Sequence, residues 1–229
     1  EFTTTRNVVC EIGAAKKLSD YCKTLGMQRV MFITDPGILQ TGMAQPLIKL
    51  IESAGISVLL YSDVLADPPE ALVLSTVEIA RRENIDGVIG FGGGSSMDVA
   101  KLVSVMTIND QPLGEMYGID QVTGKRLPLI QVPTTAGTGS EVTAVSIITT
   151  GETTKAGVVS KQLLPDLALL DAELTVGLPA HITAATGIDA MVHAIEAYTT
   201  KHKKNVYSDM LSKQALSLMS ASIVEAVHN

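Results

Sequence analysis

Short apolar runs alternate with amphipathic stretches along the first 178 residues of the chain. The apolar runs have the length of buried strands, the last two being less regular, and they cover residues 29–34, 56–61, 87–91, 129–132, 141–150 and 167–170. Apolar residues recur at helical spacing between several of these runs, at residues 47–54, at 67–84 and from 98 to about 108. This alternation predicts an α/β fold in which helices cover both faces of a parallel sheet.

The pattern changes near residue 178, after which no strand-like run remains. Three helical segments fit the last part of the chain, at residues 179–186, 187–201 and 206–228. We therefore predict an α/β domain over residues 1–178 and the first part of a helical domain over residues 179–229. Apolar residues recur up to Val227 without an obvious cap, so we expect the last helix to need a partner, as in a truncated second domain.

Composition excludes several classes of function. The net charge of -7 and the 3% aromatic content disfavour a nucleic-acid-binding protein. The sequence has no run of about 18 apolar residues, so no membrane-spanning segment is expected. Cys10 and Cys22 lack the spacing of metal or redox motifs, which is typical of ordinary thiols in a cytoplasmic protein.

A glycine-rich segment, Gly92-Gly-Gly-Ser-Ser-Met-Asp98, lies between a predicted strand and a predicted helix. Gly92, Gly93 and Gly94 allow a ligand to approach the backbone, and the helix N-terminus favours an anion such as a pyrophosphate. Ser95 or Ser96 can cap the helix while donating to a phosphate. Asp98 either complements the helix dipole or orients the loop. The segment matches neither GxGxxG nor the Walker loop, and a tight turn without a ligand is the alternative.

A second polar segment, Pro133-Thr-Thr-Ala-Gly-Thr-Gly-Ser-Glu141, follows the strand at 129–132. It lies at the carboxyl edge, where open parallel sheets bind ligands. Its hydroxyl groups make it rich in hydrogen-bond donors, although a generic polar turn is the alternative. The candidate cofactor-binding residues here are Thr134, Thr135, Thr138 and Ser140.

Asp35 ends the first predicted strand, and Pro36 and Gly37 are expected to break any continuation. A carboxylate at this position can accept hydrogen bonds from an adenosine ribose and would repel a 2′-phosphate, which favours NAD over NADP. From the residues alone, a turn-forming aspartate before Pro-Gly is the stronger interpretation. Lys155 follows a predicted hairpin at 151–152 and could contact a phosphate or ribose, or be a solvated surface lysine.

Asp189 and His193 are four residues apart, so in a helix their side chains lie on one face, one turn from each other. A carboxylate oxygen and an imidazole nitrogen are both good ligands for a divalent first-row metal. Catalytic metal sites usually take at least three protein ligands, and no further cluster follows in the remaining residues. The spacing alone therefore leaves two interpretations, half of a metal site or a surface Asp with a partly buried His.

These segments, in this order, resemble the iron-containing (group III) alcohol dehydrogenase family. The resemblance rests on Thr34-Asp35, on residues 92–98, on residues 133–141 and on Ala184-Ala-Thr-Gly-Ile-Asp-Ala-Met-Val-His-Ala-Ile-Glu196. It implies a dinucleotide-binding domain, a helical domain and an active site in the cleft between them. It also implies NAD(P) along the two loops and Fe²⁺, or Zn²⁺ in some relatives, with Asp189 and His193 as the first two of four metal ligands.

The implied activity is a metal-dependent, NAD-linked interconversion of small primary alcohols or diols and their aldehydes by hydride transfer. The resemblance also implies a homo-oligomer, a dimer or larger. Two alternatives stay open, a glycerol dehydrogenase-like enzyme of the same fold and a catalytically inert NAD-binding fragment.

Overall fold

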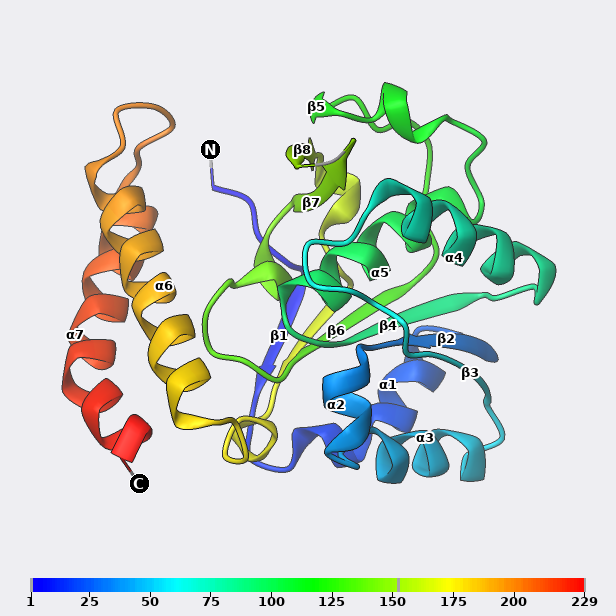
Figure 1. Cartoon of the computed structure of the whole chain (residues 1–229), viewed down its shortest axis with the longest axis horizontal. Coiled ribbons are helices and arrows are strands. Elements are labelled where there is room, and N and C mark those ends of the chain that lie inside the picture. Colours follow the sequence, from blue (N-terminus) through cyan, green and yellow to red (C-terminus); the bar gives the residue numbers. More distant parts are fainter. Residues whose placement is uncertain (1, 152, 229) are drawn as a thin grey trace.

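A computed structural model of the chain describes residues 2–151 and 153–228. Its centre is a six-stranded parallel sheet with the strand order β1-β9-β6-β4-β2-β3 (Figure 1). In that order the strands are Asn7–Cys10, Leu167–Leu170, Leu129–Pro133, Gly87–Gly92, Arg29–Ile33 and Ser57–Tyr61. Every residue of β4 and β6 is buried, because helices cover both faces of a parallel sheet.

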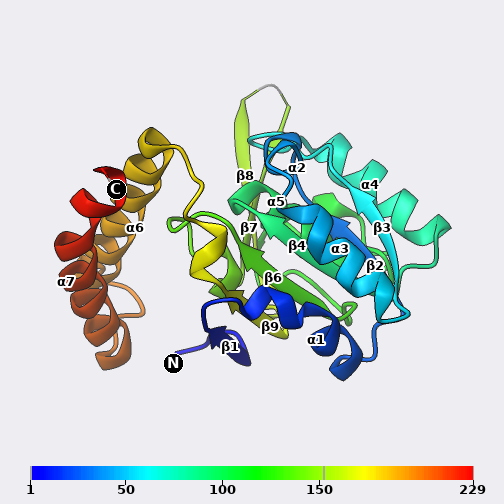
Figure 2. The same ribbon diagram turned by 90° about the horizontal axis from the view of Figure 1, so that it is seen from below.

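Five helices pack on the two faces of this sheet (Figures 1 and 2). They are α1 (Leu18–Thr24), α2 (Pro36–Gln40), α3 (Ala44–Ser53), α4 (Glu70–Arg82) and α5 (Gly94–Met106). Strand β2 shows how the faces divide, since Phe32 packs in the core beneath α1 and α3 while Met31 packs in the core beneath α4 and α5. Because successive side chains of a strand point to opposite faces of the sheet, they pack into two separate hydrophobic cores.

A smaller sheet with the order β5-β8-β7 lies at one edge of the α/β part (Figure 1). Its strands are β5 (Gly118–Ile119), β7 (Val145–Thr150) and β8 (Thr154–Val159), and the last two form an antiparallel hairpin. Short 3₁₀ helices complete the connections, and they are η1 (Ala14–Lys17), η2 (Leu113–Glu115), η3 (Ser140–Val142), η4 (Lys161–Leu163) and η5 (Ala172–Leu174).

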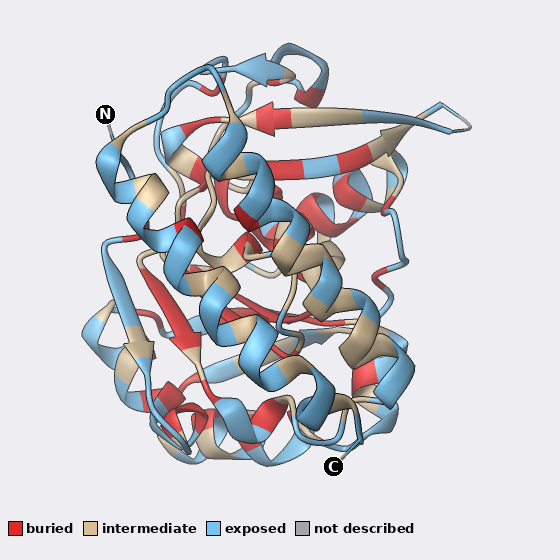
Figure 3. Cartoon of the chain, turned by 90° about the vertical axis from the view of Figure 1, so that its left-hand side faces the viewer, coloured by how far each residue is buried: buried red, intermediate tan, exposed pale blue. Residues whose placement is uncertain are grey.

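The last part of the chain is an antiparallel helical pair, α6 (Ala180–Thr199) and α7 (Val206–His228), beside the α/β part (Figures 1 and 2). The pair presents mainly exposed and half-buried residues, whereas the central strands β4 and β6 of the sheet behind it are buried (Figure 3). Ala194 and Ser212 are the buried residues that these helices contribute within the described chain. None of the helices in residues 2–151 and 153–228 is long and apolar enough to cross a membrane. The division into two domains at residue 178 stays a prediction.

The predicted α/β fold with a parallel sheet is confirmed, and two local predictions were wrong. The strand predicted from residue 141 begins at Val145, because residues 140–142 form η3. As predicted, the strand does not continue through Pro36, since β2 ends at Ile33; Pro36 in addition begins helix α2, which the Asp35 side chain caps. The two segments predicted to meet at Gly187 form the single helix α6, in which Gly187 lies against Ile223 of α7.

Candidate functional site

Apart from Lys155, the predicted cofactor-binding residues lie in the segments that follow β6, β4 and β2, which are neighbours in the sheet. We call residues 92–94 the glycine loop and residues 133–141 the Thr-rich loop. The Thr134 amide donates to the Gly92 carbonyl oxygen at 3.0 Å, which joins the loops where the strands end. A Cβ on Gly94 would lie 3.0 Å from Thr138 Cγ2, so the loops also touch farther along.

The glycine loop combines a residue position that requires glycine with a helix start that has no side-chain cap. Gly92 has φ of 143°, a conformation that L-residues with a side chain rarely adopt, and a Cβ there would lie 2.9 Å from Ser96 Oγ. Gly93 is the N-cap of α5 and makes no side-chain cap, so the prediction that Ser95 or Ser96 caps this helix was wrong. The first-turn amides of α5 therefore lack a side-chain acceptor, which suits an anion.

Asp35 divides its two oxygens between two partners. Its Oδ1 accepts from the Ile38 amide at 3.0 Å and caps α2, and its Oδ2 accepts from Ser96 Oγ at 3.3 Å. Asp35 thus has the local structural role expected of an aspartate before Pro-Gly, here as a helix N-cap. Its carboxylate also faces the first turn of α5. A cleft of about 370 Å³ is lined by residues 35–36, 64–66 and 93–96, so the structure brings Asp35 and Ser95 into one hollow with the glycine loop.

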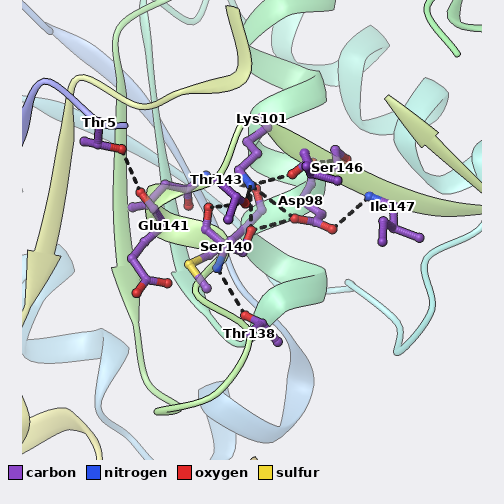
Figure 4. Close-up of polar contacts among 12 residues, drawn as sticks. Thr5, Asp98, Lys101, Thr138, Ser140, Glu141, Thr143, Ser146 and Ile147 are labelled. Carbon is purple, nitrogen blue, oxygen red and sulfur yellow. Dashed lines mark hydrogen bonds and ion pairs between the residues drawn. The ribbon is translucent and has the colours of Figure 1, made fainter. Parts of the chain in front are cut away.

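Asp98 lies beneath the Thr-rich loop and is saturated by protein partners (Figure 4). Its Oδ1 accepts from Ser140 Oγ at 2.6 Å, and its Oδ2 accepts from the Ile147 amide at 2.9 Å. Its side chain is only 14% exposed. This geometry favours the interpretation in which Asp98 orients the loop over one in which it contacts a ligand.

Sequence reasoning assigned no role to Lys101, whose side chain is 0% exposed. Its ammonium donates to the Val145 carbonyl oxygen at 2.6 Å and to Ser140 Oγ at 2.7 Å, and it lies 3.4 Å from Asp98 Oδ1 (Figure 4). Burial lowers the pKa of Lys101, and the Asp98 carboxylate opposes that effect. A signal was available in the sequence, because this lysine interrupts the apolar run Val99-Ala-Lys-Leu-Val103.

Two buried hydroxyl groups flank the end of β4. Thr34 directly follows β2 and Thr134 directly follows β6. Both are fully buried, and neither Oγ1 has a hydrogen-bond partner among the described residues. A buried polar group without a partner is uncommon and marks a place where a water or a ligand can complete the hydrogen bonding. Thr134 was a predicted site residue, whereas Thr34 was missed although it adjoins Asp35.

The remaining predicted residues lie around this centre. Thr135 is half-buried and borders Gly93, while Thr138 is exposed and its Oγ1 accepts from the Ser140 amide at 3.3 Å. Lys155 lies on β8 and pairs with Asp67 Oδ1 at 2.6 Å, with both side chains more than half exposed. Lys155 does not line the cleft; its partner Asp67 directly follows residues 64–66, which do line it.

Burial raises the pKa of Glu141 at the far end of the Thr-rich loop.

Asp189 and His193 lie on one face of α6, as predicted, with His193 Nδ1 at 3.8 Å from Asp189 Oδ2. Both are about half exposed, at 45% and 52%, and this oxygen and nitrogen donor set fits a divalent first-row metal. Among the described residues no group of three or more His, Cys, Asp or Glu side chains could hold a metal ion. The described chain therefore brings together two side chains of a kind that can bind a metal, Asp189 and His193, without a third beside them.

The Thr-rich loop also touches the helix that carries these two donors. A Cβ on Gly137 would lie 2.8 Å from Thr186 Cβ, one turn before Asp189 on α6. An apolar cleft of about 490 Å³ opens beside this contact, between the loop and the helical pair, and its lining includes Ala136, Leu178 and Ile223. A larger open hollow of about 570 Å³ lies at the amino ends of β2 and β3 and contains none of the predicted site residues.

Comparison with known families gives two matches. Residues 5–172 match the family described as iron-containing alcohol dehydrogenase, and residues 183–229 match the C-terminal part of the Fe-containing alcohol dehydrogenase family. Together they span the α/β part and the helical pair.

Individual relatives agree with these matches. Long-chain-alcohol dehydrogenase 1 of Geobacillus thermodenitrificans is 40% identical over 95% of this chain and 55% of its own length. The crystal structure of a 1,3-propanediol oxidoreductase superposes with a TM-score of 0.95 at 32% identity, covering 99% of this chain and 59% of that one. Sulfoacetaldehyde reductase from Bifidobacterium kashiwanohense in complex with NAD⁺ superposes with a TM-score of 0.89 at 32% identity, covering 99% and 60%. The chain spans about half the length of the curated relatives it matches.

Proposed function

Because this chain belongs to the iron-containing alcohol dehydrogenase family, we propose that the whole protein is a metal-dependent, NAD-linked oxidoreductase. It interconverts small primary alcohols or diols and their aldehydes. The observation that carries the proposal is the position of the Thr-rich loop, which contacts the glycine loop on one side and α6 on the other. These two contacts support a site in which the loop separates the residues proposed for the dinucleotide from the helix that carries Asp189 and His193.

The α/β part supplies the cofactor contacts in this proposal. The uncapped first turn of α5 and the glycine loop hold the pyrophosphate, and Ser95 donates to it. Thr134, Thr135, Thr138 and Ser140 form the opposite wall, with Asp98 holding that wall in place. Asp35 Oδ2 accepts from the ribose and disfavours a 2′-phosphate, so NAD is preferred over NADP. Lys155 is the weakest member of the set, since Asp67 already pairs with it.

Asp189 and His193 hold a divalent metal, Fe²⁺ or alternatively Zn²⁺, together with ligands that the described chain does not contain. When bound, the metal supplies a Lewis acid for the substrate oxygen and the nicotinamide accepts or donates the hydride. The residues of this chain would bind and orient the metal and the nicotinamide, because the Thr-rich loop lies between the glycine loop and α6 and fixes their separation. An apolar cleft opens beside Gly137 next to that junction and offers space for an apolar part of a substrate.

A second candidate applies to the 229-residue chain by itself. Its two metal donors are half exposed and have no third partner in the described part of the chain. This favours an NAD-binding unit without turnover when the chain is isolated. A glycerol dehydrogenase-like activity on the same fold is the alternative within the enzyme class.

We also propose a cytoplasmic homo-oligomer, at least a dimer. Apolar side chains exposed on the helical pair, such as Val192, Ile195 and Leu218, support assembly with another surface. The two free cysteines fit a reducing compartment. Light scattering of the full-length protein at several concentrations tests the oligomeric state.

The test of the activity uses the full-length protein loaded anaerobically with Fe²⁺ or Zn²⁺. NADH formation is followed with ethanol, propanol, 1,2-propanediol and 1,3-propanediol, beside the double variant Asp189→Ala/His193→Ala. Metal-dependent NADH formation that the double variant loses supports the proposal. Tight NAD binding without turnover of any of these alcohols, with either metal, would contradict the alcohol dehydrogenase activity and favour a different activity for this fold.

A further inference from the structure

The Thr-rich loop is tied to the glycine loop and α5 at both of its ends. At the first end, Pro133 pairs with Gly92 in the sheet and the Thr134 amide donates to the Gly92 carbonyl oxygen at 3.0 Å. At the second end no strand pairing is available, because residues 140–142 form a 3₁₀ turn. The second end depends instead on side chains, and these converge on Lys101.

Lys101 is the group that joins this second end to α5. Its ammonium donates to Ser140 Oγ at 2.7 Å, to Thr143 Oγ1 at 3.3 Å and to the Val145 carbonyl oxygen at 2.6 Å (Figure 4). These three acceptors lie 39 to 44 residues away along the chain. The buried Lys101 ammonium thus binds residues 140, 143 and 145, where the chain passes from the Thr-rich loop into β7.

The same ammonium compensates the Asp98 carboxylate, which lies 3.4 Å away on the preceding turn of α5. Asp98 in turn accepts from Ser140 Oγ at 2.6 Å and from the Ile147 amide at 2.9 Å. Removing the cation would leave a nearly buried carboxylate without a charge partner, which strongly disfavours the present packing. The Asp98 contacts therefore cannot substitute for those of Lys101.

The position of the loop matters for the cofactor because the fit to the glycine loop is close. A Cβ on Gly94 would lie 3.0 Å from Thr138 Cγ2, so a small displacement of the loop changes the width of the space above α5. We infer that Lys101 is a positioning residue, which sets the distance between the Thr-rich loop and the glycine loop and thereby the affinity for the dinucleotide. This inference rests on the proposed function of the site.

The test compares Lys101→Met with Arg126→Met in the full-length protein. Methionine keeps the length and removes the cation in both. Arg126 is a matched control, since it is also a largely buried cation paired with a carboxylate, at 2.6 Å from Asp166 Oδ2, but it lies before the amino end of β6. The two measurements are equilibrium NADH binding, followed by the fluorescence of bound NADH, and hydrogen exchange of the amides in residues 134–143.

We expect Lys101→Met to weaken NADH binding by about tenfold or more, as for loss of an ionic hydrogen-bond network, and to speed exchange in residues 134–143. Arg126→Met should leave both near the wild-type values even where it lowers the melting temperature. Wild-type exchange in residues 134–143 of Lys101→Met would overturn the inference. Faster exchange with unchanged NADH affinity would overturn it as well, because the loop would then move without consequence for the cofactor.

A milder variant keeps the test decisive where Lys101→Met fails to fold. Thr143→Val preserves the shape of the side chain and removes one acceptor of the ammonium. It should weaken NADH binding and speed loop exchange in the same direction but to a smaller extent, and no change in either would overturn the inference. A wild-type protein that fails to bind NADH contradicts the proposed function instead, while the exchange data still report whether Lys101 holds the loop.

Discussion

Gly137 packs directly against the backbone of Thr186, where an added Cβ would lie 3.1 Å from the carbonyl oxygen and 3.2 Å from Cα. The obstacle is helix backbone, which cannot rotate aside as the end of a flexible side chain can. The contact joins the Thr-rich loop to α6, one turn before Asp189. Because residue 137 has only a hydrogen atom as its side chain, the Thr-rich loop can lie this close to α6, the helix that carries Asp189 and His193.

Gly137→Ala should reduce turnover more than it weakens NADH binding, because the loop or α6 has to move apart. A displacement of about 1 Å at such a junction can lower the rate by about a hundredfold. Steady-state kinetics and NADH titration of the full-length protein measure the two effects. Gly157→Ala is the matched control, since a Cβ there meets nothing within 4 Å and should change neither quantity. Equal kinetics for both variants would contradict the prediction.

Asp35→Asn and Asp35→Ala should separate the two roles of this side chain. Asparagine still accepts from the Ile38 amide, so stability is retained, but the loss of charge should raise kcat/KM with NADP relative to NAD. Alanine should have the same effect on cofactor preference and also lower stability by about 1 kcal/mol, as for loss of an N-cap. Thermal unfolding and kinetics with both cofactors test this. An unchanged preference in both variants would remove Asp35 from the cofactor site.

Asp166 should contribute acid-sensitive stability. Burial raises the pKa of its carboxyl, but hydrogen bonds from Arg126 and from the Leu129 amide outweigh burial and hold the pKa below its usual value of 3.8. Because the folded pKa is the lower one, the stabilisation is present above about pH 4 and is lost as the pH falls through the folded pKa.

Asp166→Asn should therefore cost about 1.5–3 kcal/mol at pH 7, the range for hydrogen bonds to charged groups. The difference from wild type should shrink as the pH falls below 3.8, the usual pKa of the group. Urea unfolding at a series of pH values measures it, with the exposed Asp110→Asn as control. A constant difference across the acid range would show that the charge of Asp166 is not what stabilises the fold.

The two thiols should differ in reactivity. Cys10 is exposed on the edge strand β1, whereas Cys22 is buried in α1, and burial raises the pKa of Cys22 to about 12. The thiolate is the reactive form, so at pH 8 a thiol reagent should label Cys10 in the native protein and label both residues after denaturation. Peptide mass spectrometry distinguishes them, and rapid native labelling of Cys22 would contradict this packing.

Much of the fold follows from local pattern. The strand β4 is a continuous apolar run ended by glycines, so both its burial and the loop after it can be read from neighbouring residues. The same holds for the pairing of Asp189 with His193, since four-residue spacing on a helix fixes the geometry. These features need no knowledge of distant segments.

The features that were missed depend on partners far away in the chain. Apart from Asp98, the partners of Lys101 lie 39 to 44 residues later, so the apolar run around it gave no hint of what it binds. The intrinsic tendency of Gly187 to interrupt a helix is overridden by its contact with Ile223 of α7. Strand β1 was missed because half-exposed edge residues carry little apolar pattern and its partner β9 begins at Leu167.

The pairing of β1 with β9 also sets an order for synthesis on the ribosome. The first strand to emerge, beginning at Asn7, has as its sheet neighbour the last one to emerge, beginning at Leu167. Strands β2, β3, β4 and β6 can associate once residue 133 is available, but β1 must wait until β9 leaves the exit tunnel. The nascent chain therefore carries β1 without its sheet partner until residues 167–170 are available, a period in which a chaperone can protect the unpaired strand.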